Sequence, residues 1–261
     1  MNKEKLLLKL QPYGFENFQY QNQYGLNALM FCLKYNDTMH LDLDNEEWDY
    51  LIQNSLLKQQ ENSGYNALMY ALENNQNINL TTKQLDYLIK NSDIKQKMND
   101  TTSLIYFILF NNKKEMNMEE NTLNYFIKNS DVHHQNKNGW NAFLCALKTI
   151  ETNPKNTSYI KKIYSCLNEE EKQETFYKIC EKYIGITKEF NQNHILFMLY
   201  DVQMKLTEET LKKLNKNERY QDKLIKNQYQ ELLRMIEKRD VLWDLNKNLN
   251  QEKNKKDVLK I

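Results

Sequence analysis

The residue types that most often do chemistry are scattered along this sequence. His133 and His134 are adjacent, but adjacent side chains point in different directions, and no cysteine or carboxylate pattern completes a tetrahedral metal site. The pair is predicted to lie at a polar turn, with His40 in a loop and His194 in a helix. The sequence has no phosphate-binding glycine loop, serine nucleophile elbow or zinc-hydrolase helix. We therefore expect no catalytic activity, no bound metal and no small-molecule cofactor.

Cysteine usage and charge balance narrow the functional classes further. The four cysteines are Cys32, Cys145, Cys166 and Cys180. They form no Cys-x-x-Cys pair and lie within apolar helical patterns, which predicts reduced, buried thiols in a cytosolic protein. Lys and Arg number 36 against 35 Asp and Glu, so the chain has no overall basic field for nucleic acid. The apolar runs at 6–10 and 103–110 are too short for a signal peptide or a membrane span, so no membrane insertion is expected.

Two short motifs alternate along the chain with a steady rhythm. The first, Asp/Asn-Tyr-apolar-Ile-polar-Asn-Ser, recurs after 37 and 38 residues, at 49–55, 86–92 and 124–130. The second opens with Gly-x-Asn-Ala and recurs after 39, 36 and 39 residues, at 25–30, 64–69, 100–105 (a weaker copy) and 139–144. Two motifs that alternate in phase indicate a structural repeat.

Each repeat is predicted to contain an inner and an outer helix. A good N-cap residue precedes each inner helix, namely Asn27, Asn66, Thr102 and Asn141. The inner helix is apolar on all sides, as in 67–72, which predicts that it packs between neighbours. The outer helices have one apolar face, and their predicted caps are Asp44, Thr81 and Glu119, of which Glu119 is the weakest. With only 5 Gly and 2 Pro, the composition also favours helices.

The segments between the helix pairs repeat as well. Each contains an apolar residue that is expected to anchor the turn (Phe18, Leu57, Ile94 or Val132) and a glutamine (Gln21, Gln60, Gln96 or Gln135). We expect the glutamines to bond the neighbouring turn and form a ladder. A degenerate fifth repeat aligns residues 191–199 with 64–72, and its longer spacing predicts an inserted helix at about 169–184 that ends at Gly185.

These residues resemble the ankyrin-repeat family. Gly64-Tyr65-Asn66-Ala67-Leu68-Met69-Tyr70-Ala71 is similar to the family's Gly-x-Thr-Ala-Leu-His-x-Ala, with Asn66 for Thr and Met69 for His. Residues 91–94 and 129–132 look like its Gly-Ala-Asp-Val. The repeats here are longer than the family's usual length of roughly 33 residues. A different solenoid of helical pairs is the alternative.

The expected fold is an all-α helix-turn-helix solenoid of four to five ankyrin-like repeats with terminal capping helices. An N-terminal capping helix occupies 1–14, and the repeat solenoid occupies 15–217. Its units start near 15, 56, 93, 131 and 186. A C-terminal amphipathic helix at 218–245 and a polar, lysine-rich tail at 246–261 complete the chain.

The resemblance implies a non-enzymatic protein-interaction scaffold, an adaptor or inhibitor such as an immunity or effector protein, that binds a protein partner on a concave face. On our alignment, that face carries the predicted partner-binding residues Tyr24, Leu26, Tyr35, Tyr65, Phe110, Trp140 and Tyr200. The alternatives are a structural subunit of a larger assembly and a weak nucleic-acid binder through the basic tail. The expected location is the cytoplasm of the producing cell, or of a host cell if the protein is exported.

Overall fold

A computed structural model of the chain describes residues 3–74, 77–98, 100–111, 118–150, 157–184, 190–216, 227–242 and 244. These residues are almost all helical or in short connections, which confirms the predicted all-α class. Within the described ranges, the one sheet pairs β1 (Lys97–Met98) antiparallel with β2 (Thr101–Thr102). The chain divides into two compact units, Met1–Cys166 and Leu167–Ile261. The sequence had indicated one uninterrupted repeat region over 15–217.

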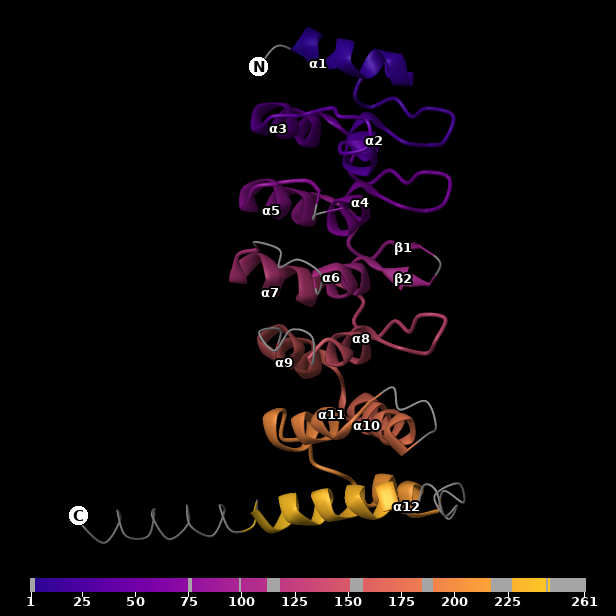
Figure 1. The fold of residues 1–261 in the computed structure, drawn as a ribbon, viewed down its shortest axis with the longest axis vertical. Helices are drawn as coiled ribbons and strands as arrows, with labels where there is room; N and C mark the ends of the chain where they lie inside the picture. The colour runs from indigo at the N-terminus through magenta and orange to yellow at the C-terminus, as the bar shows by residue number, and fades with distance from the viewer. Residues whose placement is uncertain are drawn as a thin grey trace, which may run out of the picture. The chain divides into compact units, whose positions relative to one another are not determined.

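The inner helices of the first unit lie next to one another in chain order, as Figure 1 shows. They are α2 (Ala28–Tyr35), α4 (Ala67–Glu73), α6 (Ser103–Asn111) and α8 (Ala142–Lys148). Their side chains are buried over most of each helix. The predicted caps are confirmed, because the side chains of Asn27, Asn66 and Asn141 accept backbone N–H bonds of 2.9–3.0 Å. Thr102 makes a longer bond of 3.4 Å to Ile105.

The outer helices form a second row, α3 (Asn45–Asn54), α5 (Thr82–Asn91), α7 (Glu120–Asn129) and α9 (Thr157–Cys166), each packed on the next (Figure 1). Asp44 and Thr81 cap α3 and α5 in reciprocal capping boxes with Glu47 and Gln84. Glu119 makes no side-chain cap bond, in agreement with its being the weakest predicted cap.

The first helix, α1 (Lys3–Leu10), caps the N-terminal end of the first unit, as predicted, and continues into a 3-10 turn, η1 (Gln11–Tyr13). Leu6 and Leu10 are fully buried. The Lys9 ammonium donates to both carboxylate oxygens of Glu47 at 2.7 and 2.9 Å. This charge-assisted contact ties α1 to α3.

A tight turn, here called the tip, precedes each inner helix and projects away from the outer helices (Figure 1). In three tips a glycine at positive φ donates its N–H to the carbonyl three residues earlier, at 2.8–2.9 Å; these are Gly25, Gly64 and Gly139. In the third tip Asp100 takes the left-handed conformation, with φ +61°. Aspartate is one of the few residues other than glycine that tolerates this region.

The links between tips follow the predicted pattern in part. The Gln21 amide donates to the Gln60 carbonyl at 2.9 Å, and the Gln60 amide bonds Gln96. The Asn62 backbone N–H also donates to the Tyr24 carbonyl at 3.2 Å. The predicted anchors are all buried, at 4–7% exposure: Phe18, Leu57, Ile94 and Val132.

The second unit contains α10 (Glu169–Ile184), α11 (Gln192–Leu196), a π-helical turn η3 (Phe197–Asp201) and α12 (Glu208–Asn215). The inserted helix is therefore confirmed as α10, whereas its predicted cap Gly185 lies outside the described residues. The alignment of the fifth repeat was wrong by two residues. It placed the cap at Asn193, but Asn191 caps α11, because His194 completes a capping box with it.

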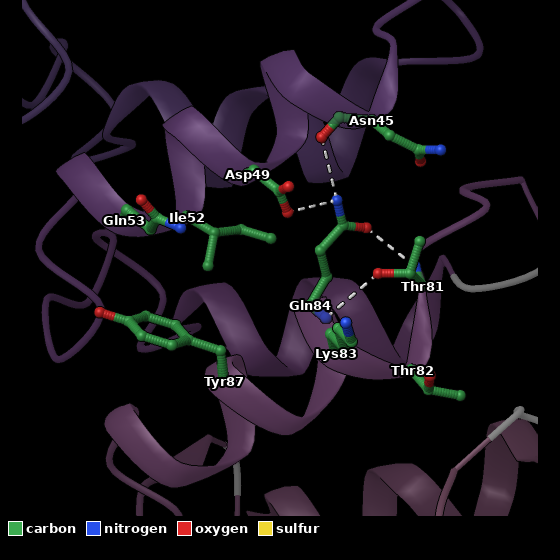
Figure 2. A pocket seen from close by; sticks show the side chains of 9 residues that line it. All are labelled: Asn45, Asp49, Ile52, Gln53, Thr81, Thr82, Lys83, Gln84 and Tyr87. Carbon is green, nitrogen blue, oxygen red and sulfur yellow. Dashed lines mark hydrogen bonds between the residues drawn. The ribbon is translucent and has the colours of Figure 1, made fainter.

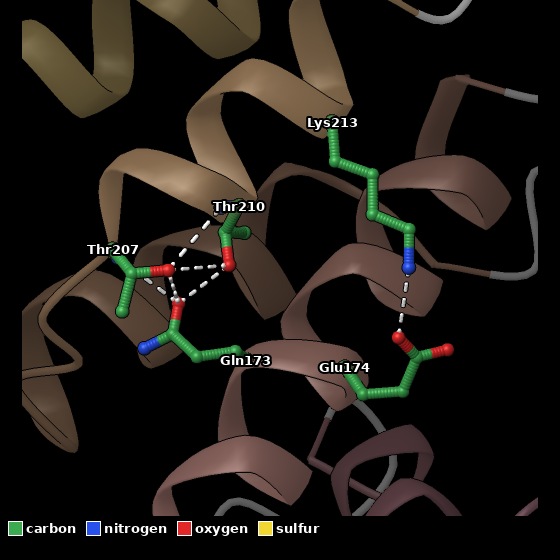
Figure 3. Close-up of polar contacts among 5 residues, drawn as sticks. All are labelled: Gln173, Glu174, Thr207, Thr210 and Lys213. Carbon is green, nitrogen blue, oxygen red and sulfur yellow. Dashed lines mark hydrogen bonds and ion pairs between the residues drawn. The ribbon is translucent and has the colours of Figure 1, made fainter.

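Polar contacts join α10 to α12, as Figure 3 shows. The Gln173 amide oxygen accepts from the Thr210 hydroxyl at 2.8 Å and from the Thr207 backbone at 3.1 Å. Lys213 pairs with Glu174 at 3.0 Å. Of the predicted C-terminal helix, residues 227–242 are helical, and the lysine-rich tail at 246–261 lies outside the described residues.

The thiols follow the prediction with one exception. Cys32, Cys145 and Cys180 are buried, and burial raises the pKa of the Cys145 thiol to about 12. Cys166 is exposed, which corrects the expectation, because it is the last residue of α9 and lies outside the buried set of that helix. No helix in the described part of the chain combines the length and apolar character needed to cross a bilayer.

Candidate interaction surface

Equivalent positions of the four inner helices meet on one face of the first unit. The fourth residue after each cap is Phe31, Tyr70, Tyr106 or Cys145, and the residue before each cap is Leu26, Tyr65, Thr101 or Trp140. Tyr65 comes from the end of a tip and stacks on Tyr70 with 4.7 Å between ring centroids. The fourth, seventh and eighth positions share one helical face. This face therefore adjoins the tips.

Aromatic rings line this face from one repeat to the next. We define the aromatic strip as Phe31, Tyr35, Tyr65, Tyr70, Tyr106, Phe110 and Trp140. The Tyr65 ring lies 5.6 Å from that of Tyr106, which stacks on Phe110 at 5.9 Å. The Tyr106 hydroxyl donates to the Tyr65 hydroxyl at 2.9 Å. Ring contacts therefore run without a break from the second repeat into the third.

Two lysines lie over the rings of the strip. The Lys34 ammonium lies 5.2 Å from the ring centroids of both Tyr35 and Tyr70, so it reaches from the first repeat into the second. The Lys148 ammonium lies 4.8 Å from the Trp140 centroid. Cations at these distances are attracted to the ring face. The lysines hold the rings in place and leave positive charge at both ends of the strip.

The surroundings of Tyr70 and Tyr106 favour their neutral forms, and those of Lys34 favour its charged form. Burial, helped by the charge of Glu61, raises the pKa of Tyr70 to about 12, although Lys34 opposes this shift. Burial and the hydrogen bond with Tyr65 raise the pKa of Tyr106 as well. Burial would lower the pKa of Lys34, but hydrogen bonds with Tyr70 and Tyr35 outweigh it and raise that pKa. Phe31, Tyr70 and Tyr106 are only 6%, 3% and 7% exposed, so the rings that the strip offers to solvent are those of its half-buried members, Tyr35, Tyr65, Phe110 and Trp140.

The seven predicted partner-binding residues do not all lie on the strip. Tyr35, Tyr65, Phe110 and Trp140 are half-buried members of the strip. Tyr24 is 61% exposed at the first tip. Tyr200 is 37% exposed in η3 of the second unit.

Leu26 differs from the expectation that it lies at the surface, because it is only 2% exposed. The N-terminal segment covers this end of the unit, where Tyr13 and Phe15 pack on Phe31 at centroid distances of 4.8 and 5.2 Å. An apolar side chain is favoured in that enclosed setting. Leu26 is therefore part of the core.

Sequence reasoning missed Lys34, Lys148, Tyr70 and Tyr106. Their positions were treated as generic parts of a helix that is apolar on all sides. The available signal was the fourth position after the cap, which is aromatic in three consecutive repeats (Phe31, Tyr70 and Tyr106). Tyrosine in a helix otherwise built from aliphatic residues indicates a place where a hydroxyl can reach solvent or a polar partner.

A second feature lies on the outer side, between α3 and α5. Two adjoining hollows of about 540 and 280 Å³ share Ile52, Gln53 and Tyr87. Figure 2 shows the Gln84 amide filling the gap between the helices. It donates to the Asn45 carbonyl at 3.1 Å and to the Asp49 carboxylate at 2.8 Å. These bonds join neighbouring repeats, so the polar groups between the two hollows are already paired within the fold.

Within the described ranges, no group of three or more His, Cys, Asp or Glu side chains could hold a metal ion. The histidine pair lies in a tip, as predicted, and the His134 ring bonds the Asp100 carbonyl at 2.8 Å. What the strip offers is area for contact, with hydroxyl and ammonium groups that can set orientation.

The sequence matches no model of a known protein family. A search among curated proteins also found no significant match. The function of the chain is therefore inferred from its own residues.

Proposed function

We propose that this chain is a non-enzymatic scaffold that binds a protein partner through the aromatic strip, and that its fold is a divergent ankyrin-type solenoid. The observation that carries the proposal is the unbroken ring contact from Tyr65 and Tyr70 to Tyr106 and Phe110, on the face that adjoins the tips. Tyrosine and tryptophan bury much area with few rotatable bonds, and they dominate the energetics of many interfaces.

The ankyrin assignment is supported by how the chain compensates for its departures from that pattern. Asparagine replaces the signature threonine at the caps, and its amide makes a bond that threonine cannot make. The Asn66 amide donates to the Asp93 carbonyl at 3.0 Å, and that of Asn27 donates to Leu56 at 3.2 Å. These two caps thus also hold the turn before the next repeat. This bridge takes over part of the bracing that the missing histidine would give.

The proposed mechanism is steric, since a partner held on the strip is blocked or brought near a third molecule. An adaptor or an inhibitor, including an immunity or effector protein, uses this principle. The cytoplasmic location of such a protein stays a prediction.

The test is a quantitative capture of partners by the full chain and by two strip variants, Tyr65→Ala and Trp140→Ala. Tyr125→Ala is the matched control, since Tyr125 is 37% exposed on the outer helix α7. A partner should be depleted at least roughly 10-fold by each strip variant, equivalent to about 1.4 kcal/mol. The control should retain it. Unfolding of both strip variants, checked by circular dichroism, would show that these rings serve the core.

A structural subunit of a larger assembly is the second candidate. Val241 and Leu242 are 60% and 42% exposed at the end of the helix over 227–242, and exposed apolar residues favour a further contact there. Solution mass separates the two functions. A soluble monomer favours the scaffold, and a chain that is insoluble without partners favours the subunit.

A further inference from the structure

The seventh position after each cap forms a row of its own along the strip. Its residues are Lys34, Glu73, Leu109 and Lys148, one from each inner helix. Leu109 is 46% exposed, which is unusual for an apolar residue among charged equivalents. Read from the first repeat to the fourth, the row is positive, negative, apolar and positive.

Contacts place the two lysines of this row on the side of the rings, and the equivalent seventh positions of α4 and α6 share that helical face. Lys34 lies over Tyr70 of the next repeat, and Lys148 lies over Trp140. Leu109 directly precedes Phe110, which stacks on Tyr106. A partner lying on the rings would therefore meet each member of the row in turn.

The spacing of the row matches an extended peptide. Packed helices lie roughly 8–10 Å apart, so successive members of the row are separated by about that distance. An extended chain in the polyproline II conformation advances about 3.1 Å per residue with three residues per turn, so one turn covers about one repeat and every third side chain faces the same side. A segment of about ten residues can thus contact all four positions.

We propose that the row binds a segment of the partner in the polyproline II conformation, in which every third residue is, in order, acidic, basic, apolar and acidic. The acidic residues pair with Lys34 and Lys148, and the basic residue pairs with Glu73. The apolar residue covers Leu109 and the neighbouring Phe110. Complementary charges select the partner and its register, and the rings supply most of the buried area. The inference rests on the proposed function, since it names the chemistry of the partner segment.

The test uses two labelled synthetic peptides and the full chain. The first carries Asp, Lys, Leu and Asp at every third position, with serine and alanine between them. Its charge-inverted twin carries Lys, Asp, Leu and Lys. In fluorescence anisotropy the first peptide should bind at least roughly 10-fold more tightly, and the preference should shrink as salt rises.

A charge swap makes the test specific to the row. Glu73→Lys should weaken the first peptide, and replacing the peptide's second contact residue by Asp should restore its affinity. Lys128→Glu on α7 is the control, because Lys128 is exposed on an outer helix, away from the row. Circular dichroism confirms that each variant is folded.

Every outcome bears on the proposal. Preference for the first peptide together with rescue by the swap supports it. Equal binding of both peptides, preference for the twin, or no binding of either overturns the peptide chemistry. The capture experiment with Tyr65→Ala and Trp140→Ala is read separately. A failed peptide test beside a successful capture therefore rejects this inference alone.

Discussion

The inner and outer helices of the first unit hold the repeats together in different ways. Inner helices are buried on nearly all sides and connect repeats through capping asparagines and aromatic rings. Outer helices bury one face and connect repeats through side-chain pairs, such as Gln84 with Asp49 and Thr122 with Asp86. The outer row thus uses its polar groups within the fold. The inner row leaves half-buried rings and lysines on the face that adjoins the tips, which is the face on which we propose that a partner binds.

The pairing of the outer helices recurs at the same place in each repeat. The residue three positions after the cap bonds the preceding helix in three cases, through Glu47, Gln84 and Thr122. Burial opposes ionisation of Asp86, but hydrogen bonds from Lys90 and Thr122 outweigh it and lower the pKa of that carboxyl. Such buried or half-buried pairs have strict geometry, so they favour one register between neighbouring repeats.

The largest effect on stability is expected for a change in the inner row, Asn66→Ala. The change removes a helix cap and leaves the Asp93 carbonyl without its bridge, so the free energy of unfolding should fall by about 3 kcal/mol. Urea unfolding followed by circular dichroism measures it. Asn66→Thr is the control, since threonine keeps the cap and loses only the bridge, and it should cost clearly less. Equal loss in both variants would show that the bridge contributes everything and the cap nothing.

A smaller effect on stability is expected for a change in the outer row, Gln84→Ala. Gln84 is 3% exposed and bonds both the cap of its own helix and the preceding helix. Loss of the Gln84 side chain should lower the free energy of unfolding by about 1–2 kcal/mol. A double-mutant cycle with Asp49→Ala should give a coupling energy of about 0.5–1 kcal/mol. Additive effects would mean that the pair does not link the repeats.

Alkaline pH should destabilise the inner row through Tyr70. The pKa of Tyr70 is raised to about 12 from an ordinary value of 10.0. A raised pKa in the folded state gives stability that is complete below the unfolded value and is lost as pH rises through the folded value. Stability should therefore fall between about pH 10 and pH 12. Tyr70→Phe should lessen that fall in an alkaline titration, and an unchanged curve would exclude this tyrosine as the cause.

The smallest effect on stability is expected at the open face. Leu109→Ala should change the free energy of unfolding by no more than about 0.5 kcal/mol, because the side chain is largely exposed. Lys128→Ala provides the exposed control on an outer helix. Thermal unfolding of the two variants should be alike. A large loss for Leu109→Ala would place that residue in the core and remove it from the binding row.

Much of the fold could be predicted, because the decisive features are local. A cap followed by an apolar run specifies each inner helix, and the repeated heptapeptide specifies three outer helices. The chain's division near Cys166 and the cap at Asn191 were not predicted. The first depends on packing between distant segments, and the second depends on a histidine that completes a capping box, an uncommon choice.

The candidate site was predicted less completely. The position before the cap indicated Tyr65 and Trp140, which are half-buried members of the strip, and their role in binding stays a prediction. The same rule was wrong for Leu26, because a pattern within the repeats does not show that the N-terminal segment covers the first of them. Lys34 was missed because its contact with Tyr70 lies across a repeat boundary and becomes visible only when neighbouring helices are packed.

The most direct test of the central claim is site-specific photo-crosslinking in cells that make the protein. A photoreactive phenylalanine analogue replaces Tyr65 on the strip in one chain and Tyr125 on α7 in another. The account predicts a discrete crosslinked partner from position 65, lost when Lys148 is changed to Glu, and none from position 125. A partner captured from position 125 and not from position 65 would contradict it, because the outer row would then be the binding face.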